Sequence, residues 1–462
     1  MTRRLFGTDG VRGVAGELIT AELALALGAA ATRRVGNERP QVLIVRDTRE
    51  SGEMLQAAIA AGVSAAGGDT LLGGVLPTPA APLLLKRYGF DLAVVLSASH
   101  NPYQDNGIKL FAADGYKLSD EDELEIERAL ATAGQPFTAE LLTADGSSKT
   151  GGASGTAAGR ASRIGRIREL RGAHEDYLRE LHTRFCELRL DGCKVLLDCA
   201  NGATYRVAPE IFRRLGATVT ATAVNPDGRN INADCGSTHV AGLAEQVVKG
   251  GHDLGFAFDG DGDRVLAIDR RGVVVDGDEL MALAALHLRE QQRLAGDGVV
   301  VTVMTNYGFH AAMSKAGIDV ACTSVGDRYV LEELRKRAWS FGGEQSGHII
   351  DMSFNSTGDG IAGALLTLEA LAGRDLSERA AMRKLPQRLV NVSVRDRAAL
   401  ANAHRVKDAV RLEDEALRGR GRVLVRPSGT EPLVRVMVEA PTDEEAEQAC
   451  ERLVTLVRRE LG

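Results

Sequence analysis

Short apolar runs rich in β-branched residues alternate along this chain with longer Ala- and Leu-rich stretches of helical spacing. The apolar runs predict strands, each stopping where a polar or glycine-rich loop begins: Val42–Val45, Leu92–Leu96, Val195–Leu197, Leu254–Phe258 and Val299–Met304. This alternation is typical of α/β units with largely parallel sheets. Ligands of such sheets bind at the carboxyl ends of the strands. We therefore expect the functional residues in the loops that follow these runs.

One unit of strand, loop, helix and second strand recurs along the chain. It covers Val195–Thr218 and Val299–Val320, and the first 75 residues follow the same pattern around a helix at Glu53–Ala66. All βαβ units share this pattern. Internal duplication and independent origin therefore both stay open.

A composition break separates the first of these units from the second. Ala144–Gly165 holds six glycines and four serines without hydrophobic periodicity, which predicts a linker or an exposed loop. Before it, Ser119 and Asp122 form a capping-box pattern that opens a helix ending near Ala133. After it, Arg166–Phe185 predicts a charged helix.

The end of the chain has a different character. Three alternating segments predict strands and a last segment predicts a helix: Val390–Val394, Val423–Val425, Val434–Val438 and Asp443–Leu461. The prediction is a smaller α+β domain after three α/β domains with mixed, largely parallel sheets, all around a central cleft. The expected borders are 1–140, 166–253, 254–374 and 375–462.

Composition agrees with an ordinary globular protein. At roughly 150 residues per domain, 462 residues correspond to three or four domains. The net charge of −7 argues against nucleic-acid binding. The six scattered cysteines predict neither a disulfide framework nor a zinc site. Because we find no secretory signal and no apolar run long enough to span a membrane, we expect a cytoplasmic protein without membrane contact.

Two of the strand-end loops carry the strongest chemistry. In Leu96–Pro102, Ser99 stands beside His100, so it is a candidate nucleophile or phosphate carrier, although the same residues are common in turns. In Phe258–Arg264, three carboxylates alternate with glycines directly after an apolar strand. Such carboxylates repel one another unless a cation neutralises them, and few hard oxygen ligands suit Mg²⁺. The spacing does not fit an EF-hand loop.

Three further loops carry weaker signals. Gly342–His348 places Glu344 and Ser346 between glycines, where they can pair with sugar hydroxyls. Arg426–Pro432 combines an arginine with hydroxyls and backbone N–H groups around a glycine, which suits a phosphate dianion. Phe6–Gly13 is a glycine-punctuated loop that presents Arg12. Each of the first two also has an ordinary turn as its alternative.

Taken together and in their order along the chain, these five loops resemble the motifs of the α-D-phosphohexomutase superfamily. Within it, Phe6–Gly13, Gly343–His348 and Val325–Tyr329 favour the bacterial enzymes of glucosamine phosphates over the phosphoglucomutase/phosphomannomutase branch, which stays the alternative. The resemblance covers the whole chain except Ala144–Gly165. It implies three related α/β domains and a smaller fourth domain that closes on the ligand.

The resemblance also implies a role for each motif residue. Ser99 would be the phosphoserine, and its phosphate with Asp259, Asp261 and Asp263 would hold one Mg²⁺ per active site. Proton transfer and charge stabilisation would fall to Arg12, His100 and Lys109. Sugar hydroxyls would be bound by Glu344 and Ser346. The remote phosphate of the substrate would be held by Arg426, Ser428, Gly429, Thr430 and Arg435.

The implied reaction interconverts glucosamine 6-phosphate and glucosamine 1-phosphate through a bisphosphate, and feeds the synthesis of amino-sugar nucleotides and cell-wall precursors. Two other classes remain as alternatives. One is a phosphatase of the haloacid-dehalogenase type, in which Asp259 itself is phosphorylated. The other is a sugar-phosphate sensor without activity, which would be expected to lack Ser99 or one carboxylate. The oligomeric state stays open, with a homodimer as one option.

Overall fold

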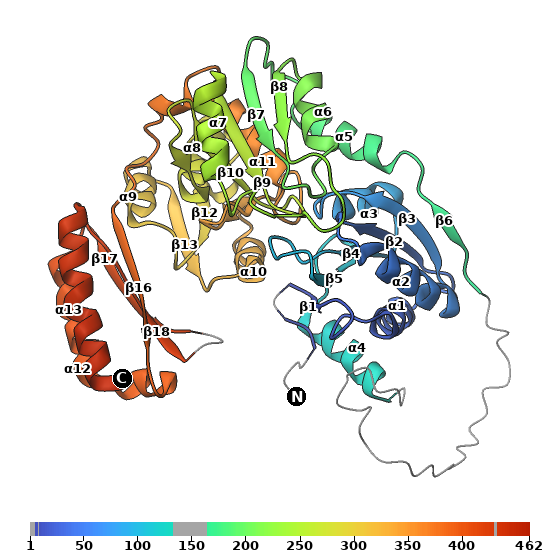
Figure 1. The fold of residues 1–462 in the computed structure, drawn as a ribbon, viewed down its shortest axis with the longest axis horizontal. Helices are drawn as coiled ribbons and strands as arrows, with labels where there is room; N and C mark the ends of the chain where they lie inside the picture. The colour runs from blue at the N-terminus through green and yellow to red at the C-terminus, as the bar shows by residue number, and fades with distance from the viewer. Residues whose placement is uncertain (1–4, 8, 133–163, 429–431) are drawn as a thin grey trace.

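The computed structural model describes residues 5–7, 9–132, 164–428 and 432–462. These residues form four sheets with their helices, which follow one another in an arc (Figure 1). The first three sheets are mixed, and the fourth is a small antiparallel sheet. We call them the first, second, third and C-terminal units. Their arrangement confirms the predicted class of three α/β units and one α+β unit.

The first unit is a six-stranded sheet in the order β1-β5-β4-β2-β3-β6. Its strands are β1 (Val11–Val14), β2 (Gln41–Arg46), β3 (Asp69–Val75), β4 (Leu92–Leu96), β5 (Asp105–Ala112) and β6 (Ile167–Glu169). Its helices are α1 (Ala21–Val35), α2 (Gly52–Ala65), α3 (Ala80–Tyr88) and α4 (Asp120–Thr132). Strand β5 runs antiparallel to both β4 and β1. This pairing brings Arg12 on β1 and Lys109 on β5 to the end of the sheet at which the Ser99 loop leaves β4.

One predicted helix in this region is wrong at its start. Residues 167–169 of Arg166–Phe185 form β6, which pairs in parallel with β3, and the helix α5 begins only at Ala173. The edge of β3 presents backbone N–H and C=O groups, and an extended segment can pair with them whereas a helix cannot. The capping box at α4 is confirmed, because Ser119 Oγ accepts from the Asp122 amide at 3.2 Å.

The second unit has the sheet order β11-β10-β9-β7-β8. Its elements are α5 (Ala173–Arg184), β7 (Lys194–Asp198), α6 (Val207–Arg214), β8 (Thr218–Thr222), α7 (Ala241–Gly250), β9 (Leu254–Phe258), β10 (Val265–Asp269) and β11 (Val274–Val275). Strand β9 pairs in parallel with β7, so the border expected at Leu254 runs through this sheet and has to be corrected. The acidic loop between β9 and β10 therefore belongs to the second unit.

The third unit has the sheet order β13-β12-β14-β15, and the C-terminal unit has the order β16-β18-β17. The third unit contains α8 (Gly277–Glu290), η2 (Ala295–Asp297), β12 (Gly298–Thr302), α9 (Tyr307–Ala316), β13 (Asp319–Thr323), α10 (Asp327–Arg337), β14 (Phe341–Gly343), β15 (Ile349–Asp351), α11 (Gly360–Leu371) and η3 (Leu376–Glu378). The C-terminal unit contains β16 (Gln387–Ser393), η4 (Arg397–Asn402), α12 (His404–Ala416), β17 (Arg422–Pro427), β18 (Leu433–Glu439) and α13 (Asp443–Leu461).

One hydrophobic cluster connects the first three units, and the fourth has a separate one. One cluster runs from Val45 in the first unit through Phe256 to Phe341 in the third. The C-terminal unit has a cluster of its own, which includes Val436 and Leu453. Polar contacts join it to the third unit, among them the hydrogen bond from the Tyr307 amide to Glu439 Oε2 at 2.7 Å. None of the described helices has the length and apolar character that a bilayer-crossing segment needs.

The packing of α1 on α2 gives a prediction for stability. A Cβ atom on Gly62 of α2 would lie 2.0 Å from the backbone oxygen of Leu25 in α1. Because that oxygen is backbone and cannot move away alone, Gly62→Ala is expected to destabilise the first unit by about 1–3 kcal/mol. Native-state hydrogen exchange of the α1 and α2 amides measures this loss.

The matched control is Gly242→Ala in α7, where the new Cβ meets no atom within 4 Å. There the better helix propensity of alanine is expected to leave stability unchanged or raise it by up to about 1 kcal/mol. Equal exchange rates in the two variants would contradict the close α1–α2 packing.

Candidate active site

The loop after β4 holds Ser99 in an unusual backbone conformation. Its φ is 54°, in the left-handed region that few residues other than glycine adopt. The Ser99 amide donates to Ser97 Oγ at 2.9 Å, and its hydroxyl donates to Asp259 Oδ2 at 2.5 Å. The hydroxyl also lies 3.5 Å from His100 Nδ1. The structure thus brings together the serine loop of the first unit and the acidic loop of the second.

The three aspartates of the acidic loop converge at this point. One carboxylate oxygen from each of Asp259, Asp261 and Asp263 lies within 4.8 Å of the others, and all three side chains are buried. Burial, followed by the charges of Asp263 and Asp261, raises the pKa of Asp259 well above its usual range. Within the described chain, Asp261 Oδ1 and Asp263 Oδ1 are buried without a hydrogen-bond partner. Unpaired buried carboxylate oxygens of this kind fit a hard divalent cation, so the triad can hold a metal ion.

Cationic side chains from the first unit face the aspartates. Lys109 is almost fully buried, and its Nζ lies 2.8 Å from Asp261 Oδ2 and 3.0 Å from Asp9 Oδ2. Burial alone would lower the pKa of Lys109, but the carboxylates of Asp261 and Asp9 raise it above the ordinary value. Arg12 also pairs with Asp9. Both cations predicted for this site therefore carry a positive charge beside the acidic loop.

His100 is held in the neutral form by its surroundings. Its Nδ1 lies 3.1 Å from Arg264 Nη1. Burial, followed by the charges of Arg264 and Arg12, lowers the pKa of His100 to about 4. Because a guanidinium can only donate, Nδ1 is the accepting nitrogen of this neutral ring and Nε2 carries its hydrogen.

Several residues of the site received no role from the sequence. Asp9 bridges Arg12 and Lys109, as described above. The Arg264 amide donates to Asp259 Oδ1 at 3.1 Å. His348 Nδ1 lies 3.6 Å from Asp263 Oδ2. Burial alone would lower the pKa of His348, but the carboxylates around it, Asp263 first, raise it. All three lie inside motifs that the sequence analysis had identified. Their closeness in sequence to residues with an assigned role was the signal that could have found them.

The loop between β14 and β15 reaches the acidic loop from the third unit. The Val265 amide donates to the Gly347 carbonyl at 3.1 Å, which fixes this loop over the start of β10. Glu344 is buried, and its Oε1 accepts from the Gly326 amide at 2.9 Å, just before α10. Ser346 is exposed. The pair expected to bind sugar thus lies on a loop that also carries His348 to the aspartates.

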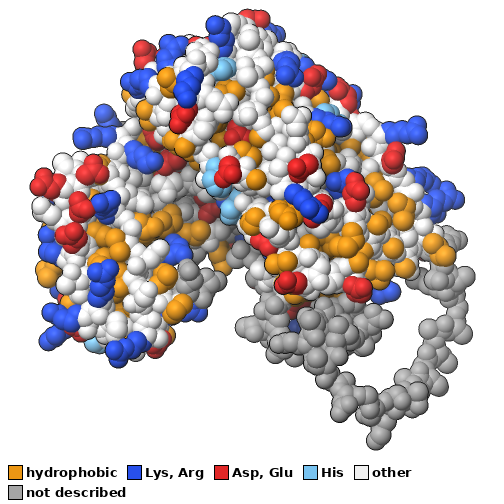
Figure 2. All heavy atoms as spheres, in the orientation of Figure 1, with side chains coloured by type: hydrophobic (Ala, Val, Ile, Leu, Met, Phe, Trp, Pro, Cys, Tyr) orange, Lys and Arg blue, Asp and Glu red, His pale blue; other side chains and the backbone are white. Residues whose placement is uncertain are grey.

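The C-terminal unit brings two predicted arginines into direct opposition. Arg426 on β17 and Arg435 on β18 are cross-strand partners, and burial followed by the charge of Arg435 lowers the pKa of Arg426. Like charges in opposite positions destabilise a sheet, and a bound anion removes that repulsion. The Ser428 carbonyl accepts from Arg397 Nη1 at 2.8 Å, while Gly429 and Thr430 lie outside the described residues. Figure 2 shows the surface hollowed between this unit and the other three.

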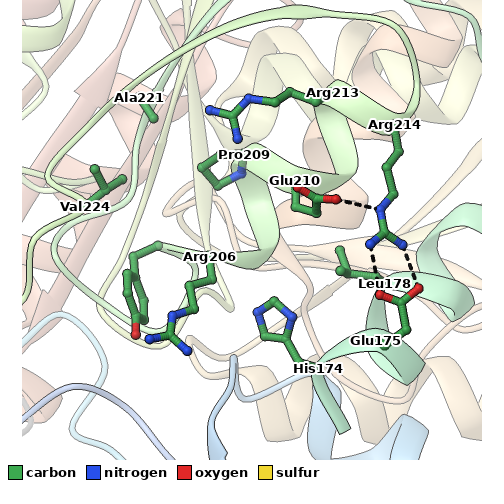
Figure 3. Close-up of a pocket in the computed structure, with 11 residues that line it drawn as sticks. His174, Glu175, Leu178, Arg206, Pro209, Glu210, Arg213, Arg214, Ala221 and Val224 are labelled. Carbon is green, nitrogen blue, oxygen red and sulfur yellow. Dashed lines mark hydrogen bonds and ion pairs between the residues drawn. The ribbon is translucent and has the colours of Figure 1, made fainter. Parts of the chain in front are cut away.

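A separate pocket of about 520 Å³ lies between α5 and α6 (Figure 3). His174, Arg206 and Arg213 line it, and Arg214 at its edge pairs with Glu175 and Glu210. None of the predicted site residues lines this pocket. It is therefore distinct from the cluster around Ser99.

Comparison with known proteins agrees with the division into four units. Models of the four domains of phosphoglucomutase/phosphomannomutase match the chain: domain I over residues 3–136, domain II over 175–272, domain III over 276–389 and the C-terminal domain over 389–456. Domain II ends after the acidic loop, as the sheet pairing also requires.

Solved structures share the fold at low sequence identity. A phosphoglucomutase/phosphomannomutase family protein from Burkholderia thailandensis aligns with a TM-score of 0.79 and 20% identity, over 99% of this chain and 97% of its own. The N-acetylphosphoglucosamine mutase of Aspergillus fumigatus, in complex with GlcNAc-6P and magnesium, aligns with a TM-score of 0.64 and 19% identity, over 100% and 96%.

Curated relatives are much closer in sequence. The phosphoglucosamine mutase of Mycolicibacterium vanbaalenii is 49% identical, over 98% of this chain and 99% of that protein. That of Moorella thermoacetica is also 49% identical, over 96% and 97%. With this identity along nearly the whole length, the chain belongs to the phosphoglucosamine mutase family of the α-D-phosphohexomutase superfamily.

Proposed function

We propose that this mutase interconverts glucosamine 6-phosphate and glucosamine 1-phosphate, with Ser99 as the phosphate carrier and a 1,6-bisphosphate as the intermediate. The contact between Ser99 Oγ and Asp259 Oδ2 carries the proposal, because it directs a strained serine into a buried acidic cluster. The names of the curated relatives support the choice of a hexosamine phosphate as substrate.

A phosphate on Ser99 and the carboxylates of Asp259, Asp261 and Asp263 would hold one Mg²⁺. When bound, the ion neutralises charge on the phosphoryl oxygens, the largest contribution that a site can make to this reaction. The partnerless oxygens of Asp261 and Asp263 support a metal here. The magnesium complex of the Aspergillus enzyme supports the choice of ion.

The remaining residues of the centre divide the work by position. His100 lies beside Ser99 Oγ and would assist the proton exchange in which the attacking sugar hydroxyl loses a proton and Ser99 Oγ gains one. Lys109 and Arg12 keep their charges and stabilise negative charge that builds up on the transferred group. Transfer to the free hydroxyl gives the bisphosphate, and after the sugar turns over, its other phosphate returns to Ser99.

The substrate itself would be held from the third and C-terminal units. Glu344 and Ser346 would bind sugar hydroxyls, and the phosphate that does not react would be bound by Arg426, Ser428, Gly429, Thr430 and Arg435. The opposed arginines support this, since a phosphate dianion between them removes their repulsion. One fixed phosphate site serves both half-reactions, because the two ends of the sugar exchange places.

The first prediction concerns the carrier. Ser99→Ala removes the only atom that accepts the phosphate, so mutase activity is expected to fall by at least about a thousandfold. Peptide mass spectrometry of the native protein is expected to find phosphate on Ser99, stable to hydroxylamine, which cleaves an acyl phosphate. Ser119→Ala, at the cap of α4, is the control and keeps full activity. Phosphate on Ser97 or Asp259 instead would refute the assignment.

A second prediction concerns the metal. Excess chelator is expected to abolish turnover, and added Mg²⁺ to restore it. Asp261→Asn removes a negative ligand and is expected to weaken Mg²⁺ binding, measured by calorimetry, by about 10- to 100-fold. The control is Asp234→Asn, an exposed acid in the same unit. Undiminished turnover in chelator would exclude the metal role.

The third prediction separates the two substrate sites. Arg426→Ala is expected to lower kcat/KM in both directions by at least about tenfold, because a charged hydrogen-bond partner is lost, while Ser99 stays phosphorylated. Glu344→Gln is expected to change the preference for glucosamine over glucose phosphate more than phosphate affinity. Arg388→Ala, an exposed position on β16, is the control. The opposite pattern in the two variants would mean that the sites are assigned the wrong way round.

A further inference from the structure

Two side chains from different units bind the same two carbonyl groups of the serine loop. The Ser99 carbonyl accepts from Arg49 Nη2 at 2.8 Å and from Asn232 Nδ2 at 2.9 Å. The Asn101 carbonyl accepts from the same two nitrogens, at 2.9 Å and 3.0 Å. These carbonyls lie on either side of His100. The loop is therefore held at both sides of the residue pair that does the chemistry.

Arg49 holds the loop from within the first unit. It is buried, its Nε donates to Asp47 Oδ2 at 2.8 Å, and its Nη1 donates to the Asp105 carbonyl at 3.0 Å. Asp47 Oδ2 also accepts from Ser97 Oγ at 2.6 Å. Asp47 thus balances the charge of the guanidinium, and the rest of its rigid fork is used on backbone oxygens of the loop.

Asn232 reaches the loop from the second unit. Asn232 is buried and has a φ of 58°. Its backbone N–H donates to the Ala200 carbonyl at 2.9 Å. A Cβ on Gly260 would lie 2.5 Å from the Ser99 carbonyl oxygen and 2.7 Å from Asn232 Nδ2. The Asn232 side chain is therefore wedged between the serine loop and the acidic loop.

We propose that Asn232, together with Arg49, is a positioning residue that locks the serine loop to the acidic loop, so that both move as one body. The proposal rests on the proposed function in that the loop carries the phosphate. Ser99 does not favour its left-handed backbone by itself, so its hydroxyl direction depends on what holds the flanking carbonyls. A shift of about 1 Å at a reacting atom costs on the order of a hundredfold in rate.

The test replaces the donor of Asn232 without changing its size. Asn232→Asp tolerates the same backbone but sets a carboxylate against both carbonyls, so kcat is expected to fall about 10- to 100-fold with KM within about threefold. Amides of residues 99–101 are expected to exchange with solvent faster in hydrogen-exchange mass spectrometry. Asn225→Asp, exposed in the same loop, is the matched control and is expected to change neither.

Two further variants keep the result decisive. Asn232→Gly removes the donor without adding charge and leaves the left-handed backbone accessible, so it is expected to show the same two changes even if the aspartate variant folds poorly. Arg49→Lys keeps the positive charge but loses the guanidinium fork, so it is expected to lower kcat and to speed exchange at residues 99–101 as well. Arg39→Lys, at an exposed position, is the control and is expected to change neither.

The outcomes also separate this proposal from the proposed function. Unchanged exchange at residues 99–101 in both Asn232→Gly and Arg49→Lys overturns the proposal. A raised KM with unchanged kcat does so as well, because it would place Asn232 in substrate binding. Absence of mutase activity from the native protein overturns the proposed function, while faster exchange in the variants still supports the link between the loops.

Discussion

Three carboxylates buried at the end of β9 repel one another, and side chains from the first and third units offset this repulsion. The first unit supplies Lys109, whose Nζ lies 2.8 Å from Asp261, and the third unit supplies His348 beside Asp263. Removing a partner from such a buried cluster is costly, because the remaining charge stays out of water. The relative position of the three α/β units is therefore tied to the acidic loop itself. The hydrophobic cluster that runs through these three units stabilises the same arrangement.

Much of this architecture could be predicted from local sequence. The strands Leu92–Leu96 and Leu254–Phe258 and the helix Asp443–Leu461 lie where the apolar pattern placed them, because each has clear periodicity and polar or glycine residues at its ends. The start of Arg166–Phe185 was missed because β6 forms only against the edge of β3. The border at Leu254 was misplaced because the pairing of β9 with β7 spans more than fifty residues of sequence.

The site shows the same division between local and long-range information. Ser99 and the three aspartates follow apolar strands in short motifs, so their residue types and spacing already suggested chemistry. Arg49 and Asn232 gave no such signal, since they act through backbone carbonyls of a loop distant in sequence. A motif reports what a residue type can do. It does not report which side chains hold the motif in place, because those are chosen by tertiary packing.

Two cross-strand arginines bring like charges together on the sheet of the C-terminal unit. Arg426 and Arg435 are cross-strand partners, and burial followed by the charge of Arg435 lowers the pKa of Arg426. In the proposed function, a phosphate ester bound between them would offset the repulsion of their like charges, so part of its affinity would come from relief of repulsion within the protein. By thermodynamic linkage, such binding would stabilise the C-terminal unit, which has a hydrophobic cluster of its own and a polar contact to the third unit between Tyr307 and Glu439. A substrate held there as proposed would then add a connection between the C-terminal unit and the other three units.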